Sequence, residues 1–297
     1  MSVYFIRIAV LVTCCFAAGC ATQNNTQVPL GSELLTYHDS GKKQLAIKRI
    51  SDLLTRSELK NEQKAELHYH KAALLDELGL THLAYFDLMQ AVELKPDYAN
   101  AYNMLGIYFL RQEEFGRAYE AFDSVLELKP EHQFAYLNRA IALYYGERAG
   151  LAIKDFETFY QQDQTDPYRM LWWYFAEMKT SPEEALPRLK QRLAKAEKNS
   201  WGRMVASIYT GEKTVVDILQ AARIKDPAIY RERLCEAYFY IAKWYQLQGK
   251  QALAAHYFVQ AINTHVYLFV EFRYAANELN RMHLWPKEDL LAATAKD

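Results

Sequence analysis

Hydrophobic residues recur along the middle of the chain with a fixed period. The matching phrases AVELKPDYA and SVLELKPEH place Pro96 and Pro130 34 residues apart, with apolar residues at similar positions before each proline. A period of this length indicates a supersecondary unit that repeats and stacks on its neighbours. The pattern favours helices, and no stretch of the chain predicts a strand.

Residues 99–132 fill every position of the tetratricopeptide signature, whose unit is a pair of antiparallel helices. These positions are Tyr102, Leu105, Gly106, Phe109, Ala118, Phe122 and Pro130. We expect Gly106 and Ala118 to face each other where the two helices approach most closely. Pro130 should end the second helix, because proline has no N–H to donate and clashes with the preceding turn.

The same signature fits three other segments less fully, residues 65–98, 133–166 and 235–268. Glycines between the paired helices predict left-handed turns at Gly79, Gly146 and Gly249. Residues 168–233 lack the signature but keep helical patterns, so we expect degenerate helical hairpins there. The predicted fold is therefore all-α, a tetratricopeptide-repeat superhelical solenoid with degenerate hairpins between repeats 3 and 4.

The concave side of such a solenoid is a docking groove, lined by the first helix of each repeat. The residues expected to face it are Tyr69, Asn100, Asn103, Ile107, Leu110, Phe134, Leu137, Ile141 and Tyr144. Most are apolar, aromatic or amide residues, and the lysines that would clamp a terminal carboxylate are absent. We therefore predict recognition of an apolar or extended segment. The alternative is that Ile107, Leu110 and Ile141 only pack against a neighbouring helix of the same chain.

The N-terminus has the pattern of a bacterial lipoprotein signal. Arg7 precedes an apolar run, residues 8–18, that is shorter than the roughly 20 residues needed to span a bilayer. The run leads into Ala17-Ala18-Gly19-Cys20, where small residues suit a signal peptidase and the cysteine supplies a thiol for acylation. We expect lipidation at Cys20. The alternative is an ordinary signal peptide with an incidental cysteine.

These patterns together predict how the chain is divided. The segments are a lipoprotein signal peptide (1–19), a lipidated tether (20–32), N-terminal helices (33–64), repeats 1–3 (65–167), degenerate hairpins (168–233), repeat 4 (234–268), and C-terminal capping helices with a tail (269–297). Alanine after Cys20 resembles an outer-membrane address, so we expect a lipid-anchored protein on the periplasmic face of the outer membrane. Only Cys235 would remain as a thiol, so no intramolecular disulfide is expected.

Charge and motifs point away from nucleic acid and from catalysis. The formal net charge is −1, which gives no general attraction to nucleic acid. None of the common nucleotide-binding, zinc-protease or hydrolase motifs occurs, and the eight histidines are scattered. We expect a non-enzymatic protein without cofactor or metal. The pair Trp172-Trp173 fits a core or an interface; the alternative is a sugar-binding platform.

Longer phrases carry a resemblance to one family. They are AYEAFDSVLELKP (118–130), LNRAIALYYGERAGLA (137–152), Asp166-Pro167 followed by LWWYFAE, and FVEFRYA (269–275). With the lipid-attachment cysteine and the three-plus-one arrangement of repeats, they make the chain resemble the NlpI family of bacterial outer-membrane lipoproteins. The resemblance covers nearly the whole mature chain and is weakest before about residue 60.

The resemblance implies a helical homodimer without catalytic activity that acts as a scaffold for cell-wall enzymes. Its partners would be murein hydrolases, including a peptidoglycan endopeptidase, and a tail-specific periplasmic protease that degrades this endopeptidase. Such a protein would regulate cell-wall synthesis and turnover. The alternatives are a tetratricopeptide lipoprotein that assists outer-membrane protein or secretin assembly, and an enzyme such as a glycan hydrolase.

Overall fold

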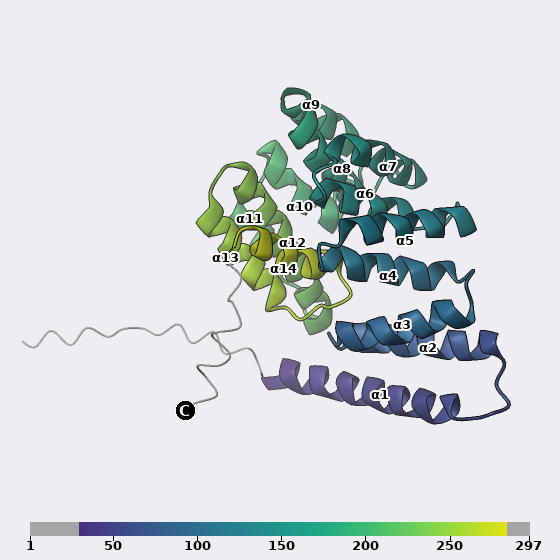
Figure 1. Cartoon of the computed structure of the whole chain (residues 1–297). Helices are drawn as coiled ribbons and strands as arrows, with labels where there is room; N and C mark the ends of the chain where they lie inside the picture. The colour runs from purple at the N-terminus through teal and green to yellow at the C-terminus, as the bar shows by residue number, and fades with distance from the viewer. Residues whose placement is uncertain (1–29, 284–297) are drawn as a thin grey trace, which may run out of the picture.

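The computed structural model of the chain describes residues 30–283, with side chains from residue 40 onwards. Within this range the chain forms fourteen α-helices and no strand, which confirms the all-α prediction (Figure 1). The helices are α1 (Leu30–Leu54), α2 (Asn61–Glu77), α3 (Thr81–Leu94), α4 (Ala99–Arg111), α5 (Phe115–Leu128), α6 (Ala135–Tyr145), α7 (Ala149–Gln162), α8 (Pro167–Thr180), α9 (Pro182–Leu193), α10 (Trp201–Thr210), α11 (Val215–Ala221), α12 (Pro227–Leu247), α13 (Gln251–Ile262) and α14 (Val270–Arg281). The predicted signal peptide, Cys20 and the residues after 283 lie outside the described range.

Helices that are adjacent in sequence pack as antiparallel hairpins and stack in order. The pairs α2/α3, α4/α5 and α6/α7 correspond to the three predicted N-terminal repeats, although α2 begins at Asn61, before the predicted limit at residue 65. Two further pairs, α8/α9 and α10/α11, occupy most of the segment that was predicted to hold degenerate hairpins. The last pair is α12/α13, and α12 is long enough to cross the predicted limit between residues 233 and 234. The stack therefore continues without a break in residues 61–262.

Close helix contact explains the glycine at the centre of the second repeat. A Cβ atom on Gly106 would lie 2.5 Å from the ring of Phe122, which is fully buried between α4 and α5. Real Cβ atoms do not approach a ring so closely, so the helices could not pair in this way with alanine at position 106. Helix α5 ends at Leu128, two residues before Pro130.

The left-handed turns differ from the prediction at one position. Gly79 and Gly249 do have positive φ, at 75° and 72°. In the third repeat, however, the left-handed residue is Glu147, with φ 59°, and Gly146 has a negative φ of −78°, so that prediction was wrong. Gly146 has a different physical role, because a Cβ there would lie 1.9 Å from the hydroxyl oxygen of Tyr119.

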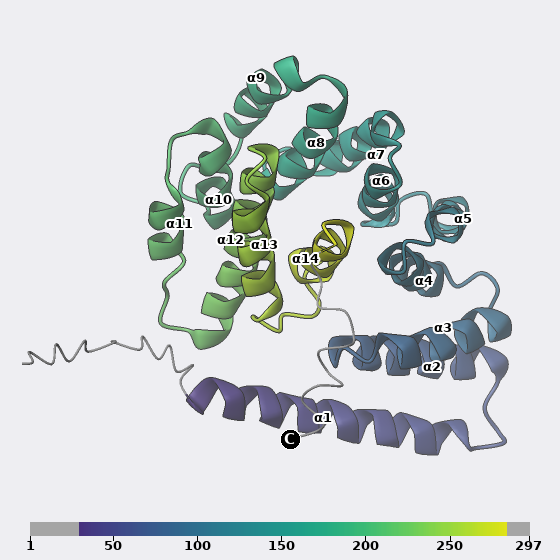
Figure 2. The same ribbon diagram turned by 60° about the vertical axis from the view of Figure 1, so that its left-hand side comes forward.

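The hairpins curve around the C-terminal helix. In Figure 2, α14 lies inside the arc formed by α2 to α13 and is surrounded by it on most sides. It packs against α13, and also against α12 and against α4 near the opposite end of the stack. Its residues Tyr274, Ala275 and Leu279 are at most 1% exposed. The concave side of the stack is thus partly filled by the chain itself.

Candidate partner-binding surface

Helix α14 is held on the concave side by polar contacts to distant repeats. The Asn277 side chain donates to the backbone oxygen of Leu110 over 3.3 Å. Arg273 forms an ion pair with Asp76 of α2. The ring of Tyr274 packs edge-on against Trp172, with centroids 5.9 Å apart. These contacts tie the last described helix to the first repeat, the second repeat and α8.

The residues predicted to line the groove differ in how exposed they are. Leu110 and Ile141 are fully buried by other parts of the chain. The others keep some exposure or border a cavity. Tyr69, Asn103 and Ile107 are half-buried, Asn100 and Phe134 are exposed, and Leu137 and Tyr144 are buried side chains that each border a cavity. Whether these residues bind a partner stays a prediction.

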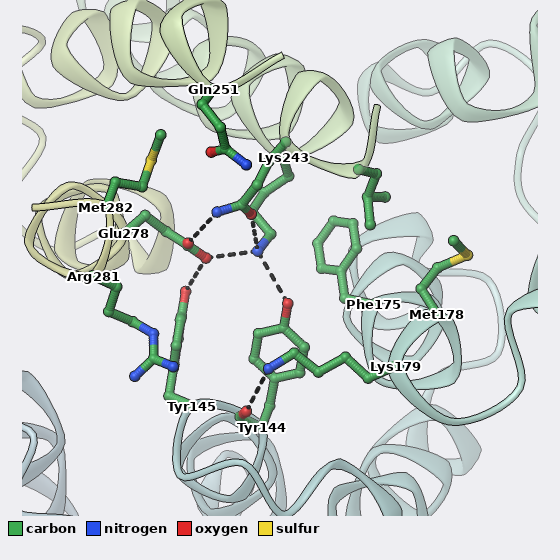
Figure 3. Close-up of a pocket in the computed structure, with 12 residues that line it drawn as sticks. Tyr144, Tyr145, Phe175, Met178, Lys179, Lys243, Gln251, Glu278, Arg281 and Met282 are labelled. Carbon is green, nitrogen blue, oxygen red and sulfur yellow. Dashed lines mark hydrogen bonds and ion pairs between the residues drawn. The ribbon is translucent and has the colours of Figure 1, made fainter. Parts of the chain in front are cut away.

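A cavity of about 500 Å³ lies on the concave side between α6, α8, α12 and α14, and we call it the central cavity. Figure 3 shows side chains from these helices pointing toward one another around it. Phe175, Met178 and Met282 give it an apolar wall. Lys179 and Arg281 lie at its charged rim. Tyr144 is the predicted groove residue that borders it.

A buried ion pair forms the floor of the central cavity. The Lys243 ammonium donates to Glu278 over 2.6 Å, to Gln246 over 2.8 Å and to the Tyr144 hydroxyl over 3.1 Å (Figure 3). The Glu278 carboxylate also accepts hydrogen bonds from Gln246 and from the Tyr145 hydroxyl. Both charged side chains are almost completely buried. The pair therefore joins α12, α14 and α6.

Electrostatics keep this pair ionised. Burial opposes charge on Lys243, but the neighbouring Glu278 carboxylate outweighs it and raises the pKa of the lysine. Burial also opposes charge on Glu278, and the ammonium lowers the pKa of that carboxyl below its ordinary value. All three donor positions of the lysine are used. A protonated lysine with no free position has neither the lone pair of a nucleophile nor that of a base, so the arrangement is structural.

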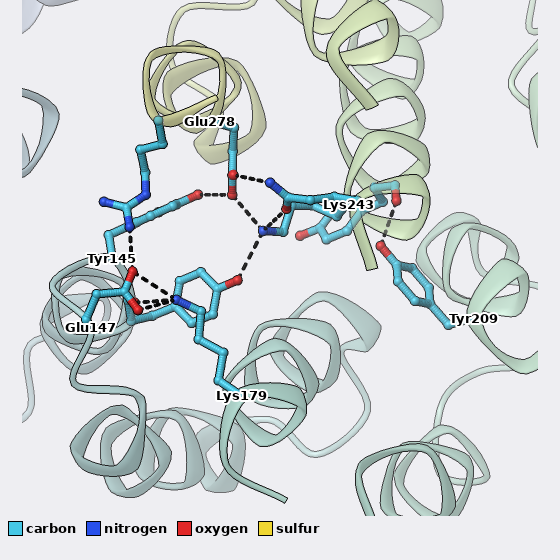
Figure 4. Close-up of polar contacts among 10 residues, drawn as sticks. Tyr145, Glu147, Lys179, Tyr209, Lys243 and Glu278 are labelled. Carbon is cyan, nitrogen blue, oxygen red and sulfur yellow. Dashed lines mark hydrogen bonds and ion pairs between the residues drawn. The ribbon is translucent and has the colours of Figure 1, made fainter. Parts of the chain in front are cut away.

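The rim of the central cavity carries a second, more exposed ion cluster. Glu147 accepts from Lys179 over 3.1 Å and pairs with Arg281 of α14 (Figure 4). Lys179 also lies over the ring of Tyr144, 4.3 Å from its centroid. Glu147 is 64% exposed, so solvent screens these contacts and each contributes little to stability. They form a polar, solvent-facing edge of the central cavity.

The structure also shows the surroundings of the tryptophan pair and of the cysteine discussed in the sequence analysis. Trp172 is 2% exposed and belongs to the core beneath α14, whereas Trp173 is half-buried with Arg192 over its ring. Cys235 is buried, and burial raises the pKa of its thiol well above the ordinary value, which disfavours the reactive thiolate. Among residues 40–283, no three histidine, cysteine or acidic side chains gather as metal ligands would. None of the described helices combines the length and apolarity that crossing a bilayer requires.

Comparison with solved structures identifies the fold. A tetratricopeptide repeat protein from Parabacteroides merdae is similar, with a TM-score of 0.54 and 15% identity over 86% of this chain and 96% of that chain. The chain has a tetratricopeptide-repeat fold. YrrB, described as a tetratricopeptide protein with an unusual peptide-binding site, gives a TM-score of 0.40 at 17% identity over 72% and 92% of the two chains. PilF of Pseudomonas aeruginosa gives 0.46 at 14% identity over 82% and 93%. No family model matches the sequence.

Proposed function

We propose that this protein is a non-catalytic scaffold that binds other proteins on its concave side. The observation that carries the proposal is the central cavity, which lies where a tetratricopeptide solenoid presents its docking face and has an apolar wall and a polar rim. The buried Lys243–Glu278 pair is consistent with this role, since it holds the surface in place and offers no reactive group.

The finer proposal names the compartment and the partners, and its support is the sequence resemblance. The chain would be anchored to the outer membrane through lipidated Cys20 and would face the periplasm, as a homodimer. It would bind murein hydrolases and present a peptidoglycan endopeptidase to a tail-specific protease. Two proteins held on one scaffold meet at an effective concentration of up to about a millimolar, so a weak contact between protease and substrate suffices.

Partner binding is tested with the full chain and two matched variants. Phe134 is 44% exposed and borders a second cavity of the concave side, separate from the central cavity, whereas Phe86 is 65% exposed on α3 and borders neither cavity. In a pull-down from periplasmic extract, we expect wild type and Phe86→Glu to retain a murein endopeptidase and a tail-specific protease. Phe134→Glu should lose both. Loss with Phe86→Glu alone would contradict the concave assignment. Turnover of purified peptidoglycan by the isolated protein would contradict a non-catalytic role.

The anchor has its own test. Cys20→Ser removes the thiol that would be acylated, so the protein should leave the membrane fraction or remain unprocessed. An unchanged amount of protein in the membrane fraction would reject lipidation at this residue. It would not affect the proposal that partners bind on the concave side.

A further inference from the structure

A second cavity, of about 280 Å³, lies where α8 and α12 meet the loop that leads into α14. We call it the acidic cavity, and the residues that define it here are Phe134, Tyr168, Glu236, Tyr240 and Glu271. Leu137, another predicted groove residue, also borders it. The acidic cavity therefore belongs to the concave side, but it is separate from the central cavity.

Two carboxylates in this cavity lack a cationic partner. Glu271 is 7% exposed in the first turn of α14, and Glu236 is half-buried on α12, where it accepts a hydrogen bond of 2.6 Å from the Trp201 indole. Among residues 40–283, no lysine, arginine or histidine forms an ion pair with either of them. The nearby Arg169 is already used, because it pairs with Asp166 and donates to the Phe159 carbonyl oxygen. Neither acidic group therefore has a counter-charge, and its ionisation is costly in a partly buried site.

Two tyrosine hydroxyls beside these carboxylates are also incompletely satisfied. The hydroxyls of Tyr168 and Tyr240 are buried, and neither makes a hydrogen bond of normal geometry, although each is close enough to a glutamate to interact with it. Tyr240 as a whole is fully buried. Buried polar groups without partners are rare in native proteins. Here they border an open cavity, so a bound ligand can supply the missing partner.

The walls of the cavity suit a flat cation. Phe134 and Tyr168 line it with aromatic side chains, whereas the ring of Phe159 is already covered by the Arg169 guanidinium, 3.8 Å from its centroid. Cations are attracted to the faces of such rings. A guanidinium group is planar, stacks on aromatic rings and can bond to carboxylates through two parallel N–H groups. An ammonium group has the charge but lacks the flat face.

We propose that the acidic cavity binds the guanidinium group of an arginine from a partner polypeptide, between Glu236 and Glu271. This inference rests on the proposed scaffold function, because the arginine would belong to an extended segment that crosses Phe134. Charge complementarity decides the class of ligand. A neutral side chain would leave both acidic groups without a counter-charge.

Binding of a guanidinium group in this cavity should release protons, and this release can be measured. Burial, together with the charge of Glu271, raises the pKa of Glu236 to about 8, and burial raises the pKa of Glu271 to about 7. Asp166 and Glu232 are the other acidic groups that act on the pair, and Tyr168 and Tyr240 are its hydroxyl neighbours. Near neutral pH the empty cavity therefore retains protons. A guanidinium ion would favour the ionised carboxylates and release protons on binding.

The test titrates the full chain with N-acetyl-arginine methylamide and, as a neutral control of the same shape, with the corresponding citrulline compound. Calorimetry in two buffers of different ionisation enthalpy measures the protons released. Glu236→Gln and Glu271→Gln should each weaken binding of the arginine compound by about tenfold or more, because each removes a charge-assisted hydrogen bond. Glu157→Gln, which removes an exposed carboxylate on α7, should leave binding unchanged. Circular dichroism confirms that each variant is folded.

Several results would overturn the proposal. They are no binding of the arginine compound, equal binding of the citrulline compound, equal affinity of the glutamine variants, or binding of calcium instead. If wild type still retrieves its protein partners in these cases, only the arginine inference fails and the scaffold function stands. If wild type binds the arginine compound but retrieves no partner, the scaffold function is the part that fails.

Discussion

Replacing Lys243 by methionine tests whether the buried ion pair holds α14 on the concave side. Methionine keeps much of the aliphatic length of lysine but removes the charge and three hydrogen bonds. Glu278 would then remain buried, with only Gln246 and the Tyr145 hydroxyl as donors. The change therefore leaves an uncompensated carboxylate between α12 and α14.

The expected loss follows from the geometry. Charges 2.6 Å apart attract by about 6 kcal/mol at an effective dielectric constant of about 20. Desolvation of both groups offsets much of this, and removal of one partner of a buried pair typically costs about 3–5 kcal/mol. We expect Lys243→Met to lower the free energy of unfolding by that amount. The double variant Lys243→Met/Glu278→Gln should recover at least about 2 kcal/mol, because no buried charge remains.

Urea denaturation followed by circular dichroism at neutral pH measures both effects. Lys179→Met is the matched control, because Lys179 is one-third exposed at the rim and should cost less than about 1 kcal/mol. A loss of under about 1 kcal/mol for Lys243→Met would refute the reasoning. The reasoning would also be refuted if the double variant lost as much stability as Lys243→Met and Glu278→Gln lose separately when added together. Additive losses would show that the two side chains do not interact.

Two further predictions concern packing and pH. Gly106→Ala should destabilise the fold by about 1–3 kcal/mol, because its Cβ would press on the Phe122 ring. Gly116→Ala is the control and should be neutral or slightly stabilising, because no atom lies within 4 Å of the new Cβ. Equal midpoints of urea denaturation for the two variants would contradict this prediction. Burial raises the pKa of Glu236 to about 8 and that of Glu271 to about 7, from 4.5, so the folded chain binds more protons than the unfolded chain in this range. The free energy of unfolding should therefore fall as the pH rises from about 5 to about 8. Glu236→Gln should make this dependence on pH less steep. A free energy of unfolding that rises over this pH range, or a variant with the same pH dependence as wild type, would show that these pKa values are not raised.

The sequence by itself determined the repeating part of the fold. The period of 34 and the filled signature in residues 99–132 predicted paired helices, and Gly106 against Phe122 shows why. Contacts within one repeat span few residues, so side-chain size at fixed offsets encodes them directly. Even there the encoding was incomplete, because Gly146 accommodates the Tyr119 hydroxyl and the left-handed turn moves to Glu147.

Only the tertiary structure decided what fills the concave side. Helix α14 contacts residues far earlier in the chain, such as Asp76, Leu110 and Tyr145. Repeat spacing says nothing about a helix outside the repeats, so the sequence predicted one open groove where the structure has separate cavities. The acidic cavity was missed for the same reason, since Glu236 and Glu271 lie on different helices and nothing in their local sequence marks them as neighbours. Helical periodicity is a local property, whereas cavity formation depends on which distant surfaces meet.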